Sequence, residues 1–388
     1  MKIVLKTFKF HLTVLRLVGM YPPTQHKTLY KIFAYFMYFF FIVPVPVCGG
    51  MHLFQQQDLN INEIANNAFL VCELGCFIVK MLPFMNNGDE IRRCIYTMEC
   101  PIFSACSEKQ AAVIHEFSRI SKRIYKVYVS LCMISVAFWA IKPMFFEETR
   151  LPLDIWLPYT DPLRNTKIYV VSYIMLVLGC FNGAISSGVV DPLIAGLAHF
   201  ASCQIKILKE DLLSLDKNIE LGDIELNQEQ IKLFVIYNRI KKCVEHYDAV
   251  LNFVQHLEGT FSLVVFSQFF ASVLVICISC LELSMVQPFT VPFYAITLFL
   301  SCMLTEVFLY CYYGTILFEE NNTLNDAIYM CPWYNFDTKS KKALIILMER
   351  SKRPIIITAG KILDLSLVTF STIIRRAYSL LAVLKNFQ

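Results

Sequence analysis

Residues 352–384 read KRPIIITAGKILDLSLVTFSTIIRRAYSLLAVL, and from Ile362 to Leu384 they contain neither Pro nor Gly. We expect a helix there, led by Pro354, because the fixed φ of proline suits the first turn of a helix. A helix of about 23 residues is roughly 34 Å long, enough to cross a bilayer core of about 30 Å. The stretch therefore predicts a membrane span at the C-terminal end of the chain.

This span is unusually polar for a helix that meets only lipid, because intramembrane charge usually faces protein or water. Its polar residues are Asp364, Ser366, Thr369, Ser371, Thr372, Arg375, Arg376 and Ser379. At helical spacing one narrow apolar face remains, formed by Ile374, Ala377, Leu381 and Leu384. That pattern suits a water-lined path with a hydrophobic constriction. An ordinary last helix of a bundle is the alternative.

The composition indicates an all-α membrane protein. The chain has 388 residues, of which 56% are hydrophobic and only 17% charged, whereas a soluble domain has about 25% charged residues. Seven apolar runs are long enough to span a bilayer. They are Leu29–Phe54, Ile61–Met85, Ile124–Phe146, Ile168–Phe200, Phe261–Val286, Phe293–Phe318 and Ile362–Leu384. The small net charge of +4 and the lack of a basic, aromatic-rich run argue against nucleic acid as a partner.

The distribution of Lys and Arg predicts the orientation. Basic residues concentrate in residues 1–28, 86–123, 201–260 and 319–353, whereas 55–60 and 287–292 contain none. Basic loops are typically cytosolic, so we expect the N-terminus inside and, after seven spans, the C-terminus outside. The chain then divides into 1–200 (an interfacial helix and four spans), 201–260 (a cytosolic helical extension), 261–318 (spans five and six), 319–352 (a cytosolic anchor helix) and 353–388 (the seventh span and an extracellular C-terminus).

No enzyme signature is present in the sequence. There is no Gly-rich phosphate loop, no HExxH zinc motif and no nucleophile elbow. The Cys-x-x-Cys of Cys277 and Cys280 lies in an apolar run, so we interpret it as packing rather than as a metal or redox site. We expect no enzymatic activity, no cofactor and no metal.

Three of the charged residues in the apolar runs bear on the interior of the bundle: Glu73, Lys80 and Lys142. Glu73 and Lys80 are seven residues apart, so they share one helix face and should both point into the bundle. We expect Glu73 to pair with Lys142, because an unpaired buried charge costs several kcal/mol. Anchoring a polar group of a ligand is the alternative role for this pair.

Two stretches near the C-terminus share an ordered motif. Residues 305–337 read TEVFLYCYYGTILFEENNTLNDAIYMCPWYNFD, and residues 353–381 read RPIIITAGKILDLSLVTFSTIIRRAYSLL. Together they resemble the C-terminal signature of the insect odorant receptor family. The matching positions are Leu309 to Gly314, Ala327, Tyr329, Trp333, Tyr334, Arg353, Pro354, Thr358 to Lys361, Leu365 to Leu367, Thr369, Phe370, Tyr378 and Ser379. The Thr-Tyr…Gln-Phe ending of the sister gustatory receptors is absent.

The resemblance implies a subunit of an odorant-gated, non-selective cation channel in the plasma membrane of olfactory neuron dendrites. Family members form tetramers, usually with a shared co-receptor, bind small volatile organic ligands and line the pore with the seventh helix. Carried onto this sequence, the gate lies at Leu381, with Ile374 and Ala377 on the same line and Leu384 and Lys385 at the outer mouth. Arg375 and Arg376 depart from the single basic or polar residue common in the family.

The resemblance also implies a ligand site between the outer halves of helices two, three, four and six. The candidate residues are Phe69, Cys72, Glu73, Ser135, Phe138, Trp139, Tyr169, Tyr173, Leu176, Tyr294 and Thr297, with Trp139 and Tyr173 foremost. Aromatic side chains supply contact area for a volatile ligand without demanding directional bonds. A gustatory-type homomeric channel and a seven-helix receptor that is not a channel remain the alternatives.

Overall fold

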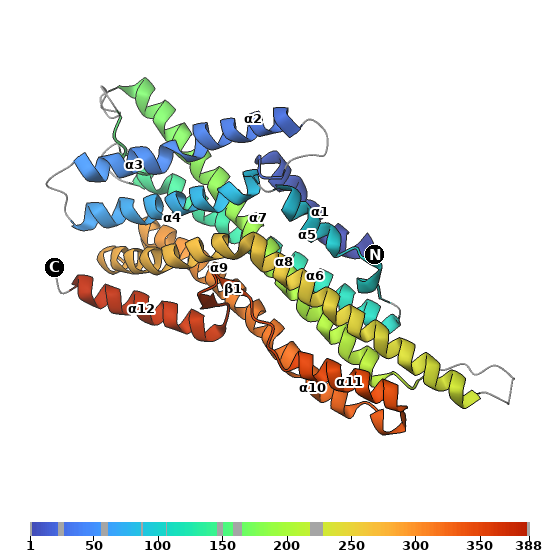
Figure 1. Ribbon diagram of the computed structural model, residues 1–388. Coiled ribbons are helices and arrows are strands. Elements are labelled where there is room, and N and C mark those ends of the chain that lie inside the picture. Colours follow the sequence, from blue (N-terminus) through green and yellow to red (C-terminus); the bar gives the residue numbers. More distant parts are fainter. Residues whose placement is uncertain are drawn as a thin grey trace.

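The computed structural model describes residues 2–21, 27–55, 61–86, 88–105, 107–145, 150–157, 165–217 and 228–385, and these are almost entirely helical (Figure 1). Among them, five helical stretches are long and apolar enough to cross a membrane: Thr28–Gln55, Glu108–Phe145, Thr166–Leu213, Glu229–Met285 and Val291–Met330. Two further helices, α4 (Ile61–Asn86) and α12 (Leu367–Lys385), pack along these and complete a bundle of seven.

The N-terminal part begins with α1 (Lys2–Leu17), which packs on α6 and α7. The first span is an α-helix, α2 (Lys27–Met37), a π-helical turn, η1 (Tyr38–Ile42), and a second α-helix, α3 (Pro44–Gln55). The break falls directly before Pro44. Proline cannot supply the N–H that a continuous helix needs, so it begins the new helix instead.

The third span is part of a much longer helix. After α5 (Gly88–Thr97) and the 3₁₀ turn η2 (Pro101–Phe103), α6 (Glu108–Ile141) runs into a second 3₁₀ turn, η3 (Lys142–Phe145). A capping box starts α6: Gln110 donates its backbone N–H to the Ser107 hydroxyl, and its side chain accepts the Ser107 N–H. This cap satisfies free N–H groups of the first turn.

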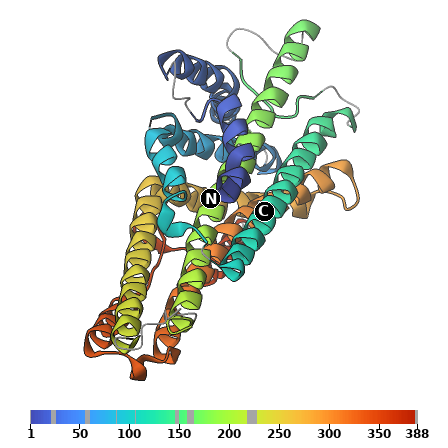
Figure 2. The same cartoon turned by 90° about the vertical axis from the view of Figure 1, so that its right-hand side faces the viewer.

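Two very long helices, α7 (Thr166–Leu213) and α8 (Gln228–Met285), run through the bundle and project from one end of it. Pro192 lies inside α7 without ending the helix. The projecting parts meet α10 (Leu324–Met330) and α11 (Thr338–Ser351) to form what we call the extension (Figures 1 and 2). The opposite end, with the C-terminus of α12, we call the distal end.

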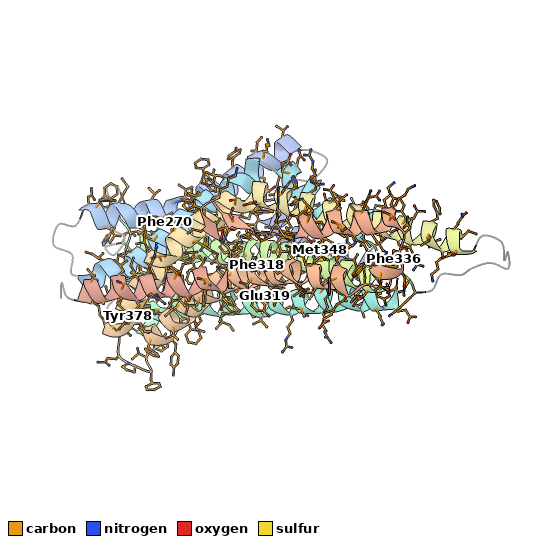
Figure 3. All side chains as sticks on the ribbon, turned by 60° about the horizontal axis from the view of Figure 1, so that its bottom comes forward. Phe270, Phe318, Glu319, Phe336, Met348 and Tyr378 are labelled. Carbon is orange, nitrogen blue, oxygen red and sulfur yellow. The ribbon has the colours of Figure 1, made fainter. Side chains whose placement is uncertain are left out.

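The apolar core of the bundle continues into the extension. α9 (Val291–Asn322) leads into it, and the 3₁₀ turn η5 (Trp333–Asn335) joins α10 to α11. Asp337 caps α11 by accepting the backbone N–H groups of Lys339 and Ser340. The buried residues that pack there are Leu208, Leu212, Leu215, Ile236, Ile240, Leu324, Ile328, Leu344 and Leu347. The molecule is therefore long and narrow, with Tyr378 of α12 on the bundle and Phe336 and Met348 on the extension (Figure 3).

The stretch before α12 is a β-hairpin, which corrects the helix predicted from Ile362 with Pro354 in its leading turn. Strands β1 (Thr358–Ala359) and β2 (Leu363–Asp364) pair antiparallel. Gly360 and Lys361 between them have φ of +62° and +59°, as a type I′ hairpin turn requires and as a helix forbids. The β-branched Ile-Ile-Ile-Thr run favours extended backbone. Asp364 and Ser366 therefore precede the last helix.

The hairpin is wedged between α8 and α9. Ser262 of α8 donates its hydroxyl to the Thr358 carbonyl over 2.9 Å and accepts the Gly360 N–H at its own carbonyl over 3.1 Å. On α9, a Cβ added to Gly314 would lie 2.1 Å from the Leu365 carbonyl oxygen. Only glycine, which has no Cβ, permits this approach. Gly314 of α9 therefore allows the backbone at Leu365, directly before α12, to lie against α9.

Candidate functional site

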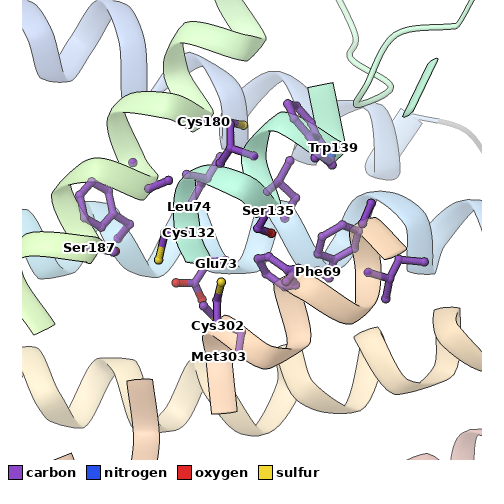
Figure 4. Close-up of a pocket in the computed structure, with 18 of the residues that line it drawn as sticks. Phe69, Glu73, Leu74, Cys132, Ser135, Trp139, Cys180, Ser187, Cys302 and Met303 are labelled. Carbon is purple, nitrogen blue, oxygen red and sulfur yellow. The ribbon is translucent and has the colours of Figure 1, made fainter. Parts of the chain in front are cut away.

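A cavity lies inside the bundle between α4, α6, α7 and α9 (Figure 4). Its empty volume is about 820 Å³, part of which opens to the outside. The walls are mainly apolar and sulfur-containing, with polar groups at a few positions. The lining residues are Phe69, Leu70, Glu73, Leu74, Phe77, Tyr128, Cys132, Ser135, Val136, Trp139, Lys142, Cys180, Gly183, Ala184, Ser187, Ala295, Ile296, Phe299, Cys302 and Met303.

Four of the candidate ligand residues line this cavity. Phe69 and Glu73 come from α4, and Ser135 and Trp139 from α6. All four are buried. Their spacings of four residues place each pair on one side of its helix. Phe69 also packs edge-on against Phe299 of α9, with 4.9 Å between the ring centroids.

Three other candidates support the wall from behind. Leu176, Tyr169 and Tyr173 of α7 pack in the cluster that contains Phe69 and Trp139. Tyr173 donates its hydroxyl to the Ala140 carbonyl, and Tyr169 donates to the Arg150 carbonyl. These tyrosines therefore tie α7 to α6 and to the segment that follows α6.

The remaining candidates lie outside the cavity lining. Cys72 is half-buried on α4 and packs on the main core. Phe138 is half-buried, with its ring centroid 6.5 Å from that of Tyr294, which is exposed. Thr297 donates its hydroxyl to the carbonyl of Phe293 within α9.

The segment 150–157 covers the cavity region at the distal end. Leu151 and Leu153 are buried against Phe69 and Trp139. Asn67 at the start of α4 accepts the Asp154 N–H over 3.2 Å. The packed leucines and this hydrogen bond hold the segment against the bundle.

A buried ion cluster lies beyond the cavity, toward the extension. Lys80 of α4 contacts Asp191 of α7, and its Nζ lies 2.8 Å from Glu306 Oε1 of α9. Tyr310, one turn further along α9, donates its hydroxyl to Asp191 over 2.7 Å. Lys80, Asp191 and Glu306 are each at most 1% exposed. One ammonium thus joins three helices of the bundle.

The expected ion pair between Glu73 and Lys142 does not form. Lys142 Nζ lies 3.3 Å from Glu282 Oε1 on α8. Glu73 Oε1 instead accepts the side-chain N–H of Gln268, also on α8, over 3.4 Å. Both residues still line the cavity and both are buried. Burial of Glu73 and Lys80 inside the bundle agrees with the prediction from their spacing.

The sequence prediction missed most of the lining. Small and sulfur-containing residues make up much of it, such as Cys132, Ala184 and Cys302, whereas the prediction favoured aromatic residues. Helical spacing carries a usable signal: Ala295, Phe299 and Cys302 follow one another at three or four residues on α9, as do Cys132 and Ser135 on α6.

The residues predicted around the gate differ in exposure along α12. Ala377 is buried against the bundle, Leu381 is half-buried and Ile374 is 39% exposed. Their place at the pore stays a prediction. Arg375 and Arg376 are both exposed. The side chains of Leu384 and Lys385 lie outside the described residues.

Within the ranges that the structure describes, no group of three or more His, Cys, Asp or Glu side chains is placed to hold a metal ion. The cavity has mainly apolar walls with a few polar groups, which suits the binding of a small molecule.

Comparison with known proteins gives a consistent result. The family model described as 7tm Odorant receptor matches residues 60–378. Odorant receptor Or1 of Anopheles gambiae is 23% identical over 98% of this chain and 95% of its own length. Odorant receptor 94a of Drosophila melanogaster is 23% identical over 98% and 97%.

The fold is similar to that of solved insect olfactory receptors. The structure of OR5 from Machilis hrabei superposes with a TM-score of 0.83, at 14% identity over 99% of this chain and 98% of that chain. The same receptor in complex with eugenol gives a TM-score of 0.81, at 16% identity and the same coverage. The arrangement of α-helices is thus the seven-transmembrane fold of these receptors.

Proposed function

Because this chain belongs to the odorant receptor family, as the match over residues 60–378 establishes, we propose that it is a subunit of a cation channel opened by a small volatile organic ligand. The ligand binds in the cavity between α4, α6, α7 and α9. One similar solved receptor is in complex with eugenol, which supports a small organic ligand here.

The cavity is the observation that carries this proposal. It is enclosed by four helices and lined mainly by apolar side chains, with a few polar groups. Such sites bind small apolar molecules by contact area and orient them through those few groups. Trp139 and Phe69, buried on adjacent helices, supply rigid aromatic surface. A ligand that touches all four helices stabilises one packing of them.

The path from the cavity to the pore runs through α8. Glu73 in the cavity wall is hydrogen-bonded to Gln268 of α8, and α8 packs along α12. A ligand that favours one packing of α4 against α8 therefore shifts α12 and opens the gate at Leu381. Its effect is limited to its differential affinity for the open state, typically about 1–3 kcal/mol in coupled sites.

The extension is the surface for assembly with other subunits, in a heterotetramer with the shared co-receptor. Several of its apolar side chains are exposed, among them Ile345, Ile346, Tyr334 and Phe234. In the proposed orientation, with the N-terminus cytosolic, no lipid reaches them, so contact with another subunit is what would bury them. The assembled channel acts in the plasma membrane of olfactory neuron dendrites.

Whole-cell recording tests the function. The chain, the insect co-receptor, both together and neither are expressed in cells that are exposed to a panel of volatiles. We expect fast inward cation currents only when both are present. If both subunits reach the cell surface and no chemical class of volatile evokes a current, the proposal is contradicted. Leu381→Ala in the active pair should raise the current in the absence of ligand, because a smaller side chain weakens a hydrophobic gate.

A further inference from the structure

One buried polar atom in the cavity wall, Oε2 of Glu73, lacks a hydrogen-bond partner among the described residues. Glu73 is 7% exposed. Its other oxygen accepts the N–H of Gln268. In Figure 4 the carboxylate lies among the residues that surround the cavity. A buried acceptor left without a partner costs free energy that a bound donor recovers.

From this geometry we infer that the cavity is selective for volatiles that carry a hydroxyl group, an alcohol or a phenol, which donates its proton to Glu73. The inference deepens the proposed function and rests on it. The apolar body of the ligand lies against Phe69, Phe299 and Trp139, and its hydroxyl points to the Glu73 carboxylate.

The chemistry of the wall selects a hydroxyl over other polar groups. Ethers, ketones and esters carry only acceptors, so they leave Glu73 Oε2 without a partner. An ammonium group loses far more hydration on entry than a neutral hydroxyl does. A hydroxyl also accepts, so it can bond to the Ser135 hydroxyl in the same wall.

The test compares an alcohol with its methyl ether. For each compound, the concentration that gives a half-maximal current is measured on the channel formed with the co-receptor. In the wild type we expect the alcohol to act at a concentration about 10- to 150-fold lower, because hydrogen bonds to charged groups are strong. In Glu73→Gln this ratio should fall below about 10-fold, and the ether should gain potency, because the new amide N–H can donate to the ether oxygen.

Cys76→Ser is the control, since Cys76 is half-buried one turn from Glu73 and does not line the cavity. It should keep the wild-type ratio. An unchanged ratio in Glu73→Gln, with a normal response to the ether, overturns the inference. If Glu73→Gln does not reach the surface, the wild-type ratio decides: equal potency of ether and alcohol overturns the inference while leaving the channel function intact. No response of the wild-type channel to any volatile refutes the proposed function instead.

Discussion

Replacing Lys80 with Met should destabilise the bundle more than any single surface change. The substitution keeps an unbranched side chain of nearly the same length but removes the ammonium that contacts both Asp191 and Glu306. Asp191 keeps the hydroxyl of Tyr310 as a donor, whereas Glu306 loses the donor that Lys80 supplies. Removing one partner of a buried ion pair costs about 3–5 kcal/mol.

That loss of stability is measurable as a fall in the melting temperature of the detergent-solubilised receptor. At about 2–4 °C per kcal/mol, the value for domains of 150–250 residues, we expect a fall of roughly 6–20 °C. Lys352→Met is the matched control. Lys352 lies 2.7 Å from Glu349 in a pair that is 60% and 73% exposed, and such pairs contribute about 0–1 kcal/mol.

Neutralising the carboxylates separates charge from packing. Adding Asp191→Asn and Glu306→Gln to Lys80→Met should recover most of the lost stability, because no uncompensated charge then remains. The reasoning fails if Lys80→Met melts within the range of the Lys352→Met control, or if the triple variant is no more stable than Lys80→Met alone.

Two further changes probe the segments that position α12 and close the extension. Gly314→Ala should displace the Leu365 backbone and so reduce the ligand-evoked current at normal surface expression. Gly75→Ala is the control and should leave the current unchanged, because a Cβ added at Gly75 meets nothing within 4 Å. Equal currents from the two variants would contradict the close approach of Gly314 and Leu365. Asp337→Ala should lower stability by about 0.5–2 kcal/mol through loss of the α11 cap. Hydrogen bonds from Ser340 hold the pKa of the Asp337 carboxyl below its usual value. The stability difference between the wild type and Asp337→Ala should therefore be largest above the pKa that Asp337 has in the unfolded chain, and it should disappear as the pH falls through the pKa that Asp337 has in the folded protein. A stability difference that does not depend on pH would show that the cap is not the cause.

The positions of the spans could be predicted from the sequence, because long apolar runs have no other stable place than lipid or a large core. The same rule misread the start of the last span. Residues 355–366 are apolar enough to continue a helix, yet the β-branched run and Gly360 fold them into a hairpin. The backbone preferences of these residues determine the structure there, and hydropathy contains no information on such preferences.

The family resemblance indicated the helices that enclose the cavity, and four of the residues expected from it, Phe69, Glu73, Ser135 and Trp139, line that cavity. That a ligand binds there stays a prediction. The partners of the buried charges could not be predicted in the same way. Lys142 pairs with Glu282, which is 140 residues away in sequence. Such pairing depends on how long helices pack against each other, and a single sequence does not contain that information.

The central claim is that the cavity between α4, α6, α7 and α9 binds the ligand that opens the channel. The most direct test is to fill this cavity with a larger side chain. Ala295 is buried in the cavity wall, so Ala295→Phe should abolish or strongly weaken odorant-evoked current at normal surface expression. Ala137→Phe, which adds the same ring to an exposed position of α6, should respond like the wild type. Unchanged potency in Ala295→Phe would show that the ligand binds elsewhere and would contradict the claim.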